Sequence, residues 1–69
     1  MGEKLKEVKI AFISTTNEVT FTNVISCYFS DYGRNTFYVV ELKDEKNTIV
    51  RYNAKDIDNI WEEDMNDEA

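Results

Sequence analysis

The feature that most constrains the fold is a stretch, residues 18–30, in which apolar and polar side chains alternate. The apolar members of the odd series are Val19, Phe21, Ile25, Cys27 and Phe29. Successive side chains of a β-strand point to opposite faces, so the pattern predicts one long strand whose odd positions face a core. Asn23 interrupts the odd series. We interpret it as a bulge or bend where the strand passes between two halves of a barrel; the alternative is two short strands.

The rest of the chain predicts shorter strands with the same enrichment in Val, Ile, Thr and aromatic residues. These strands are expected at 8–14, 36–43 and 48–53, with a short last one at 59–62. Asn53 and Asp56 are spaced to cap one helical turn before that last strand. The order predicts an all-β fold: a small SH3-like barrel of about five antiparallel strands with a one-turn helix before the last. An OB-like barrel and an open meander remain alternatives.

The hairpin around Gly33 and Arg34 sets which side chains face inward. If these two residues are the centre of a two-residue turn, the inward pairs are Phe29 with Tyr38, Cys27 with Val40, and Ile25 with Leu42. A loop of odd length would instead place Ile25 opposite Glu41 on the core side, which burial disfavours. Glycine in the first central position suits a type II′ turn.

The same register turns a second set of apolar side chains outward. Tyr28 lies opposite Val39, and Ser30 lies opposite Phe37. The predicted partner-binding residues are Tyr28, Tyr32, Arg34, Phe37 and Val39. Tyrosine-rich patches with an arginine are typical of interface centres. Three interpretations stay open: the barrel or the N-terminal segment covers the patch, a second copy of the chain binds it, or another macromolecule does.

The following hairpin is predicted to place Leu42 opposite Val50 and Val40 opposite Tyr52 in the core. Glu41 then lies opposite Arg51 on the outer face, as an opposite-charge pair. That register needs a loop of odd length, with Asn47 in a left-handed conformation.

The net charge of −6 is concentrated at the C-terminus. Residues 56–69 hold seven acidic side chains and no basic one, whereas residues 1–55 are almost neutral. We therefore predict a β-barrel domain at 1–61 and an acidic, flexible tail at 62–69. The acidic residues that could bind a basic partner are Asp56, Asp58, Glu62, Glu63 and Asp64.

Composition argues against several classes of function. The chain has no histidine and one cysteine, so the usual general base, a zinc site and an internal disulfide are all missing. We expect no enzyme, no metal and no cofactor, and Cys27 as a buried, inert thiol. The basic residues are dispersed, which argues against direct nucleic-acid binding. No stretch is apolar enough for a membrane span or a signal peptide, so a cytoplasmic protein is expected.

Three stretches, VKIAFIS, TFYVVELKDEKNTIVRY and AKDIDNIW, resemble short β-rich proteins encoded by phages and mobile elements of low-GC Gram-positive bacteria. The similarity covers roughly residues 8–61 and contains no diagnostic motif, so it assigns no functional residue. Some proteins of this kind inhibit host enzymes or bacterial defence systems. The resemblance therefore implies an inhibitor or an adaptor.

Together these observations predict a non-catalytic protein-interaction module that uses the outer face of the hairpin around Gly33. One alternative is an acidic inhibitor that mimics nucleic acid through its C-terminal carboxylates. Another is a structural protein that associates with itself. An apolar interface and a charge-driven one differ in their dependence on salt, which separates the first two hypotheses.

Overall fold

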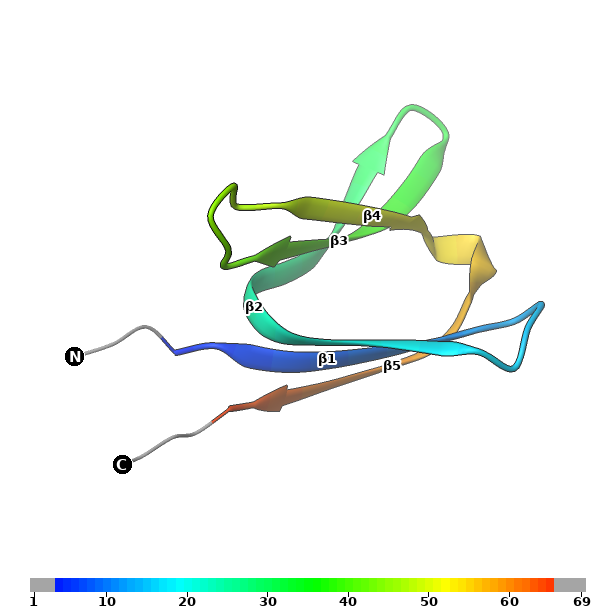
Figure 1. Ribbon diagram of the computed structural model, residues 1–69. Helices are drawn as coiled ribbons and strands as arrows, with labels where there is room; N and C mark the ends of the chain where they lie inside the picture. The colour runs from blue at the N-terminus through cyan, green and yellow to red at the C-terminus, as the bar shows by residue number, and fades with distance from the viewer. Residues whose placement is uncertain (1–3, 66–69) are drawn as a thin grey trace.

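The computed structural model describes residues 4–65, which form one antiparallel sheet of five strands (Figure 1). Its elements are β1 (Lys6–Phe12), β2 (Glu18–Tyr32), β3 (Asn35–Leu42), β4 (Ile49–Asn53), the 3-10 turn η1 (Ala54–Asp56) and β5 (Ile57–Asp64). The order across the sheet is β4-β3-β2-β1-β5. The all-β class, the five strands and the single turn before the last strand are confirmed. The sheet is not closed into a barrel.

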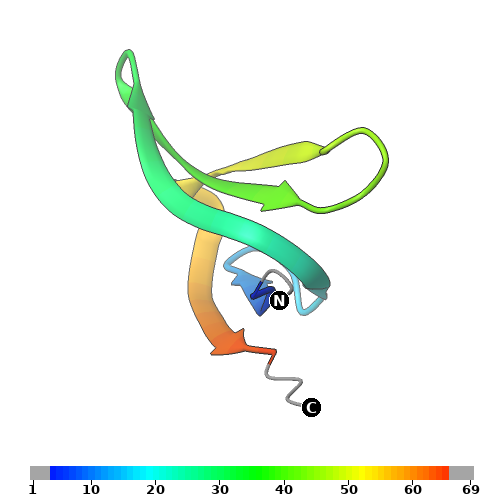
Figure 2. The same ribbon diagram turned by 90° about the vertical axis from the view of Figure 1, so that its left-hand side faces the viewer.

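Strand β2 is long and curves so strongly that β3 and β4 lie across from β1 and β5 (Figures 1 and 2). Two register shifts accompany the curve. Lys6 pairs with Val24 but Val8 pairs with Phe21, so β2 has one extra residue there. On the other side of β2, Ile25 is passed over between Val24 and Ser26. Bulges bend a strand and increase its twist.

Asn23 lies in the first of these bulges, which confirms the irregularity predicted there. Its side-chain Nδ2 donates to the carbonyl of Lys43 at 2.9 Å, and its own carbonyl accepts from the Lys43 backbone N–H at 2.8 Å. The amide thus compensates locally for the interrupted strand pairing. An asparagine at this position is therefore explained by hydrogen bonding and not by burial.

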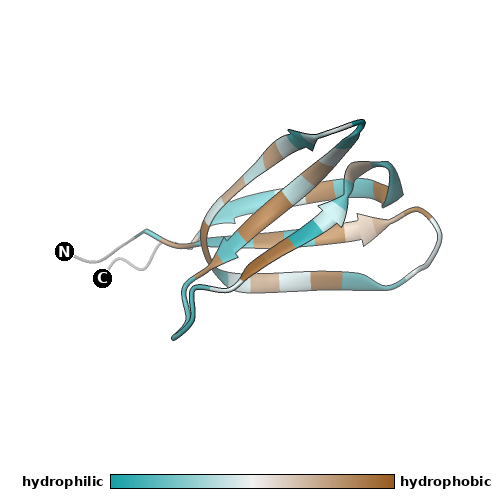
Figure 3. Ribbon diagram, turned by 90° about the horizontal axis from the view of Figure 1, so that it is seen from above, coloured by the Kyte–Doolittle hydropathy of each residue, from teal (hydrophilic) through white to brown (hydrophobic). Residues whose placement is uncertain are grey.

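The core lies between the two halves of the bent sheet. Its fully buried members are Val8, Ile10, Val24, Tyr38 and Val40. Partly buried apolar residues surround them: Phe12, Val19, Phe21, Cys27, Leu42, Tyr52, Ile57 and Ile60. The Tyr52 ring packs against Phe12 at 5.2 Å between centroids. Figure 3 shows the alternation of apolar and polar residues along the strands that produces this one-sided burial.

The predicted inward set of β2 is only partly right. Cys27 lies opposite Val40 and Phe29 opposite Tyr38, as predicted, but Val24 and not Ile25 lies opposite Leu42. The prediction for Ile25 is wrong because the bulge shifts the strand by one residue, which exchanges its two faces. Val24 is fully buried, and Ile25 is 37% exposed.

The β2–β3 hairpin has the predicted two-residue turn. Tyr32 pairs with Asn35, which leaves Gly33 and Arg34 between them. Gly33 has φ of 65°, in the left-handed region that favours glycine, and Arg34 is not among the residues with positive φ. A positive φ at the first central residue alone agrees with a type II′ turn.

The predicted register of β3 with β4 is wrong by two residues. Val40 pairs with Val50, Glu41 with Ile49, and Val39 with Arg51. The loop is longer than expected because Asp44 organises it: its Oδ1 accepts from the backbone N–H groups of Lys46 and Thr48, each at 3.0 Å. Its Oδ2 accepts from the Thr48 hydroxyl at 2.7 Å. The predicted left-handed Asn47 is confirmed, with φ of 53°.

These hydrogen bonds to Asp44 predict a pH dependence of stability. They lower the pKa of the Asp44 carboxyl, with the Thr48 hydroxyl as the largest cause. Because the folded pKa is below the unfolded one, the stabilisation is complete above the unfolded value of about 4 and is lost as the pH falls through the folded pKa. Asp44→Ala should therefore lower the denaturant midpoint at pH 7 and leave a smaller difference from wild type in acid. A gap that stays constant with pH would contradict this assignment.

Strand β5 differs from its prediction at both ends. It starts at Ile57 and runs to Asp64, where a strand of 59–62 was expected. Glu62, Glu63 and Asp64, predicted to begin the flexible tail, are thus paired with β1 opposite Val8, Glu7 and Lys6. Residues 66–69 of the predicted tail lie outside the described residues. Within residues 4–65, no helix is long and apolar enough to cross a membrane.

Candidate interaction surfaces

The aromatic outer face, which we define as Tyr28, Ser30, Tyr32, Phe37, Val39 and Arg51, lies on the side of β2, β3 and β4 away from the core. Cys27 packs against the core cluster, whereas Phe37 and Val39 line a hollow on this face. Residues one apart on a strand point to opposite sides, and the observed pairing of Tyr28 with Val39 and Ser30 with Phe37 keeps these side chains together. The predicted division of this hairpin into a core side and an outer side is therefore observed.

The hollow in the aromatic outer face has a volume of about 510 Å³ and is lined by Ser30, Tyr32, Phe37, Val39 and Arg51. Val39 is only 3% exposed and belongs to no part of the core cluster, so neighbouring side chains on the outer face cover it. Tyr32 is 77% exposed. Val39 thus forms the floor of the hollow, whereas the sequence predicted that it would contact a partner directly. Tyr32 lies at the rim of the hollow.

Tyr28 lies beside Val39 and is 43% exposed. Its hydroxyl donates to Oε2 of Glu41 at 2.9 Å. This hydrogen bond is the main cause that raises the pKa of Tyr28, and the nearby Arg51 guanidinium acts more weakly in the opposite direction. The contact favours one orientation of the phenol ring, which reduces the ordering that a partner would have to impose.

The arginine that lines the hollow of the aromatic outer face is Arg51. Arg34 lies in the exposed turn and does not line the hollow. Arg51 comes from β4 and pairs with Val39, whereas the predicted register placed it beside Glu41. The signal that could have found it is the loop: an Asp44 that bonds two backbone N–H groups closes a longer connection and moves β4 by two residues.

A second surface lies on the inner side, where the sheet is open between β5 and the β2–β3 hairpin. We call it the seam groove. It has a volume of about 440 Å³ and is lined by Phe29, Tyr38, Ala54, Ile57, Asp58, Asn59, Ile60 and Glu62. Phe29 packs on Tyr38 with ring centroids 5.0 Å apart but remains 60% exposed. Its burial was predicted from its face, and its exposure follows from the incomplete closure.

The floor of the seam groove is polar at one point. The Tyr38 hydroxyl donates to Oε2 of Glu62 at 3.1 Å, and the Lys6 ammonium lies 3.7 Å from Oε1 of the same carboxylate. Burial is the main cause that raises the pKa of Tyr38, so the phenol stays protonated as a donor. Burial likewise raises the pKa of the Cys27 thiol, which keeps it protonated and weakly nucleophilic.

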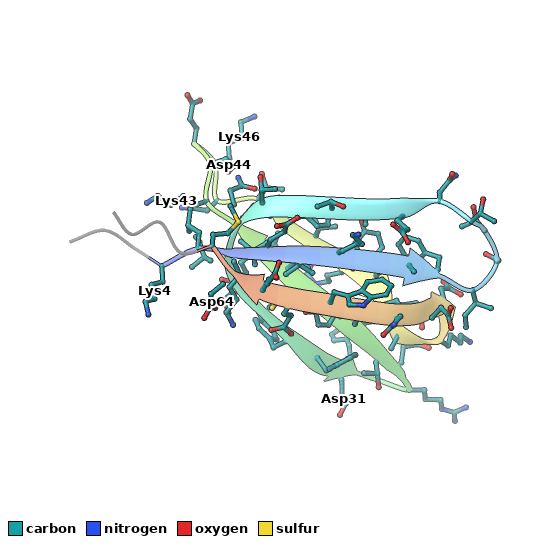
Figure 4. All side chains as sticks on the ribbon, turned by 90° about the horizontal axis from the view of Figure 1, so that it is seen from below. Lys4, Asp31, Lys43, Asp44, Lys46 and Asp64 are labelled. Atoms are coloured by element: carbon teal, nitrogen blue, oxygen red, sulfur yellow. The ribbon has the colours of Figure 1, made fainter. Side chains whose placement is uncertain are left out.

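The five acidic residues of the charge-based hypothesis divide between two elements. Asp56 lies in η1, and the other four, Asp58, Glu62, Glu63 and Asp64, lie on β5. Figure 4 shows Asp64 at the same end of the molecule as Lys4, Lys43 and Lys46, with Asp44 among them. Charges of both signs are therefore mixed at that end of the molecule.

Within residues 4–65, no group of three or more His, Cys, Asp or Glu side chains could hold a metal ion. In the same part of the chain, no buried side-chain nitrogen or oxygen lacks a hydrogen-bond partner. Comparisons with models of protein families, with curated proteins and with solved structures find no match. The two surfaces are therefore interpreted from their geometry and chemistry.

Proposed function

We propose that the protein is a non-catalytic protein-interaction module whose partner binds the aromatic outer face. The observation that carries the proposal is a hollow lined by Tyr32, Phe37 and Arg51 on the side of the sheet that does not build the core. Tyrosine, phenylalanine and arginine are enriched where interfaces are buried most deeply. A floor of Val39 and a ring of Tyr28 held by Glu41 make the surface pre-ordered, which lowers the entropic cost of binding.

The strand order β4-β3-β2-β1-β5, the bent β2 and the single turn η1 between β4 and β5 are the arrangement expected of an open SH3-like barrel. We propose that class for the fold, and for the protein a cytoplasmic adaptor or inhibitor of the kind encoded by phages and mobile elements. A small sheet that presents an aromatic face to solvent suits such a role.

The double variant Tyr28→Ser/Phe37→Ser tests the aromatic outer face. Partners captured by the wild-type chain from its host should be lost, and the affinity of a purified partner should fall about 100-fold, because two aromatic anchors are removed. The control is Phe29→Ser, which removes an exposed aromatic side chain from the opposite side of the hairpin. Circular dichroism checks that both variants fold. An unfolded double variant would assign Tyr28 and Phe37 to the core, and an unchanged affinity would remove this face from binding.

Two alternatives predict different results in the same measurements. Self-association through this face would give a mass in solution above that of one chain, reduced to one chain in the double variant.

An acidic inhibitor that mimics nucleic acid would use Asp56, Asp58, Glu62, Glu63 and Asp64 instead. Four of these five acids lie on the ordered strand β5, which gives that alternative a defined surface. Its complex should weaken steeply as salt rises, while an apolar complex should hardly change.

A further inference from the structure

In the sheet formed by residues 4–65, strand β5 is the last strand, and one of its two edges has no strand of this sheet beside it. The Met65 backbone N–H donates to the Leu5 carbonyl at 2.9 Å, in register with the pairing of β1 and β5. Along an antiparallel strand, the backbone N–H and C=O groups of successive residues point alternately to the two sides of the strand. Because Met65 points toward β1, residues 60, 62 and 64 point their backbone groups to the open edge. The Ile60 N–H accordingly bonds the Asn59 side chain at 2.9 Å. Because the Asn59 side chain occupies that N–H, the open edge offers another strand the Ile60 carbonyl and the backbone groups of residues 62 and 64.

The seam groove lies along this open edge on the inner side of the sheet. Ile57 and Ile60 of β5 line it on one side, and the exposed ring of Phe29 lines it on the other. Figure 2 shows β5 running away from the β2–β3 hairpin, so that the two elements are not paired along their length. A strand added to β5 would cover apolar surface in this groove while it pairs with the free backbone groups. Pairing and burial would thus occur together.

Charge decides what kind of strand fits. Strand β5 contains four acidic residues and no basic one, and Lys6 of the neighbouring β1 forms a salt bridge with Glu62. A second copy of β5 paired in antiparallel fashion would bring carboxylates opposite carboxylates, which is destabilising. A partner strand with lysine or arginine on its face away from the seam groove would instead neutralise Glu63, which lies on that face beside Trp61. The occupant favoured by these charges is a basic, partly apolar strand from another protein.

We propose that an extended peptide segment of alternating apolar and basic residues adds to the open edge of β5, with its apolar side chains in the seam groove. Recognition of this kind draws affinity from main-chain hydrogen bonds and specificity from the pockets for alternate side chains. The site is separate from the aromatic outer face, because Phe29 and Phe37 lie on opposite sides of the hairpin. The inference goes beyond the proposed function and does not depend on it.

The probe is an acetylated and amidated peptide of alternating lysine and valine, matched to β5 in length. Trp61 on β5, the one tryptophan of the chain, reports binding through its fluorescence. Phe29→Ser should weaken binding about tenfold, because burial of one phenylalanine side chain is lost. Phe37→Ser should leave binding unchanged, so failure of this proposal and failure of the outer-face proposal are distinguishable. A peptide with glutamate in place of lysine should not bind.

Two N-methylated forms of the probe test strand addition against attraction by charge alone. Each form carries N-methyl groups on one of the two alternating sets of backbone nitrogens, and both keep every lysine. One form should lose binding, because its blocked nitrogens face β5, and the other should bind like the parent peptide. If both forms bind equally, if Phe29→Ser has no effect, or if the parent peptide does not bind, the proposal is overturned.

Discussion

Replacement of Tyr38 by alanine is expected to leave the chain unfolded in water at room temperature. Tyr38 is the largest of the fully buried side chains and belongs to β3 at the centre of the core. Truncation of a buried aromatic side chain costs about 3–5 kcal/mol of unfolding free energy. A single core of this size supplies only about 3–5 kcal/mol of unfolding free energy in total, so the substitution removes nearly all of the stability. Loss of the far-ultraviolet circular dichroism of the sheet would be the measured result.

Two controls separate the volume of Tyr38 from its hydroxyl and from a general sensitivity of the chain. Tyr38→Phe keeps the ring and removes the hydrogen bond to Glu62, so it should fold and lose only about 1 kcal/mol. Tyr32→Ala removes a side chain that is largely in solvent and should have little effect on the midpoint of denaturation. A folded Tyr38→Ala protein with a normal midpoint would place the core elsewhere.

Much of this core could be predicted from the sequence because the β2–β3 turn is short and specific. Gly33 fixes where the chain reverses, and from there the two-residue period of the strands decides which side chains face inward. Cys27, Tyr38 and Val40 were assigned to the inner side in this way, and all three contribute to the core. The outward position of Phe37 follows from the same register.

Predictions failed where the count of residues between two strands could not be read from alternation. Two bulges in β2 reverse the phase around Val24, and a longer loop moves β4 by two residues. In both places a polar side chain bonds the backbone: Asn23 bonds Lys43, and Asp44 bonds Thr48. Such local bonds compete with regular pairing, and hydrophobic patterning does not register them.

The candidate site shows a related limit. The sequence could place Val39 on the outer face but could not show how far its neighbours cover it. It could not assign Arg51 to the hollow, because that depends on the register of β3 with β4. The seam groove was missed altogether, since it exists only because the sheet stops short of closure. Surfaces that depend on the relation of distant strands need coordinates.

The pair Val24 and Ile25 gives the strongest test of the observed phase, since alternation alone predicts the opposite result. Val24→Asp should unfold the protein. The Val24 side chain is fully buried at the bend of β2. Lys6, the residue opposite Val24 on β1, already forms a salt bridge with Glu62 and so leaves a new carboxylate without a partner. An unpaired carboxylate in such a place costs several kcal/mol, which exceeds what a core of this size can spare.

Ile25→Asp, one residue further, should remain folded with a modest loss of stability, because this side chain is partly in solvent and lies at the bulge. Denaturant unfolding of both variants, followed by circular dichroism, measures the difference directly. If Ile25→Asp unfolds while Val24→Asp does not, β2 has the uninterrupted alternation of its odd positions and the bulges are misplaced. The bend that separates the two halves of the sheet would then need another origin, because these bulges are what lets β2 serve both halves.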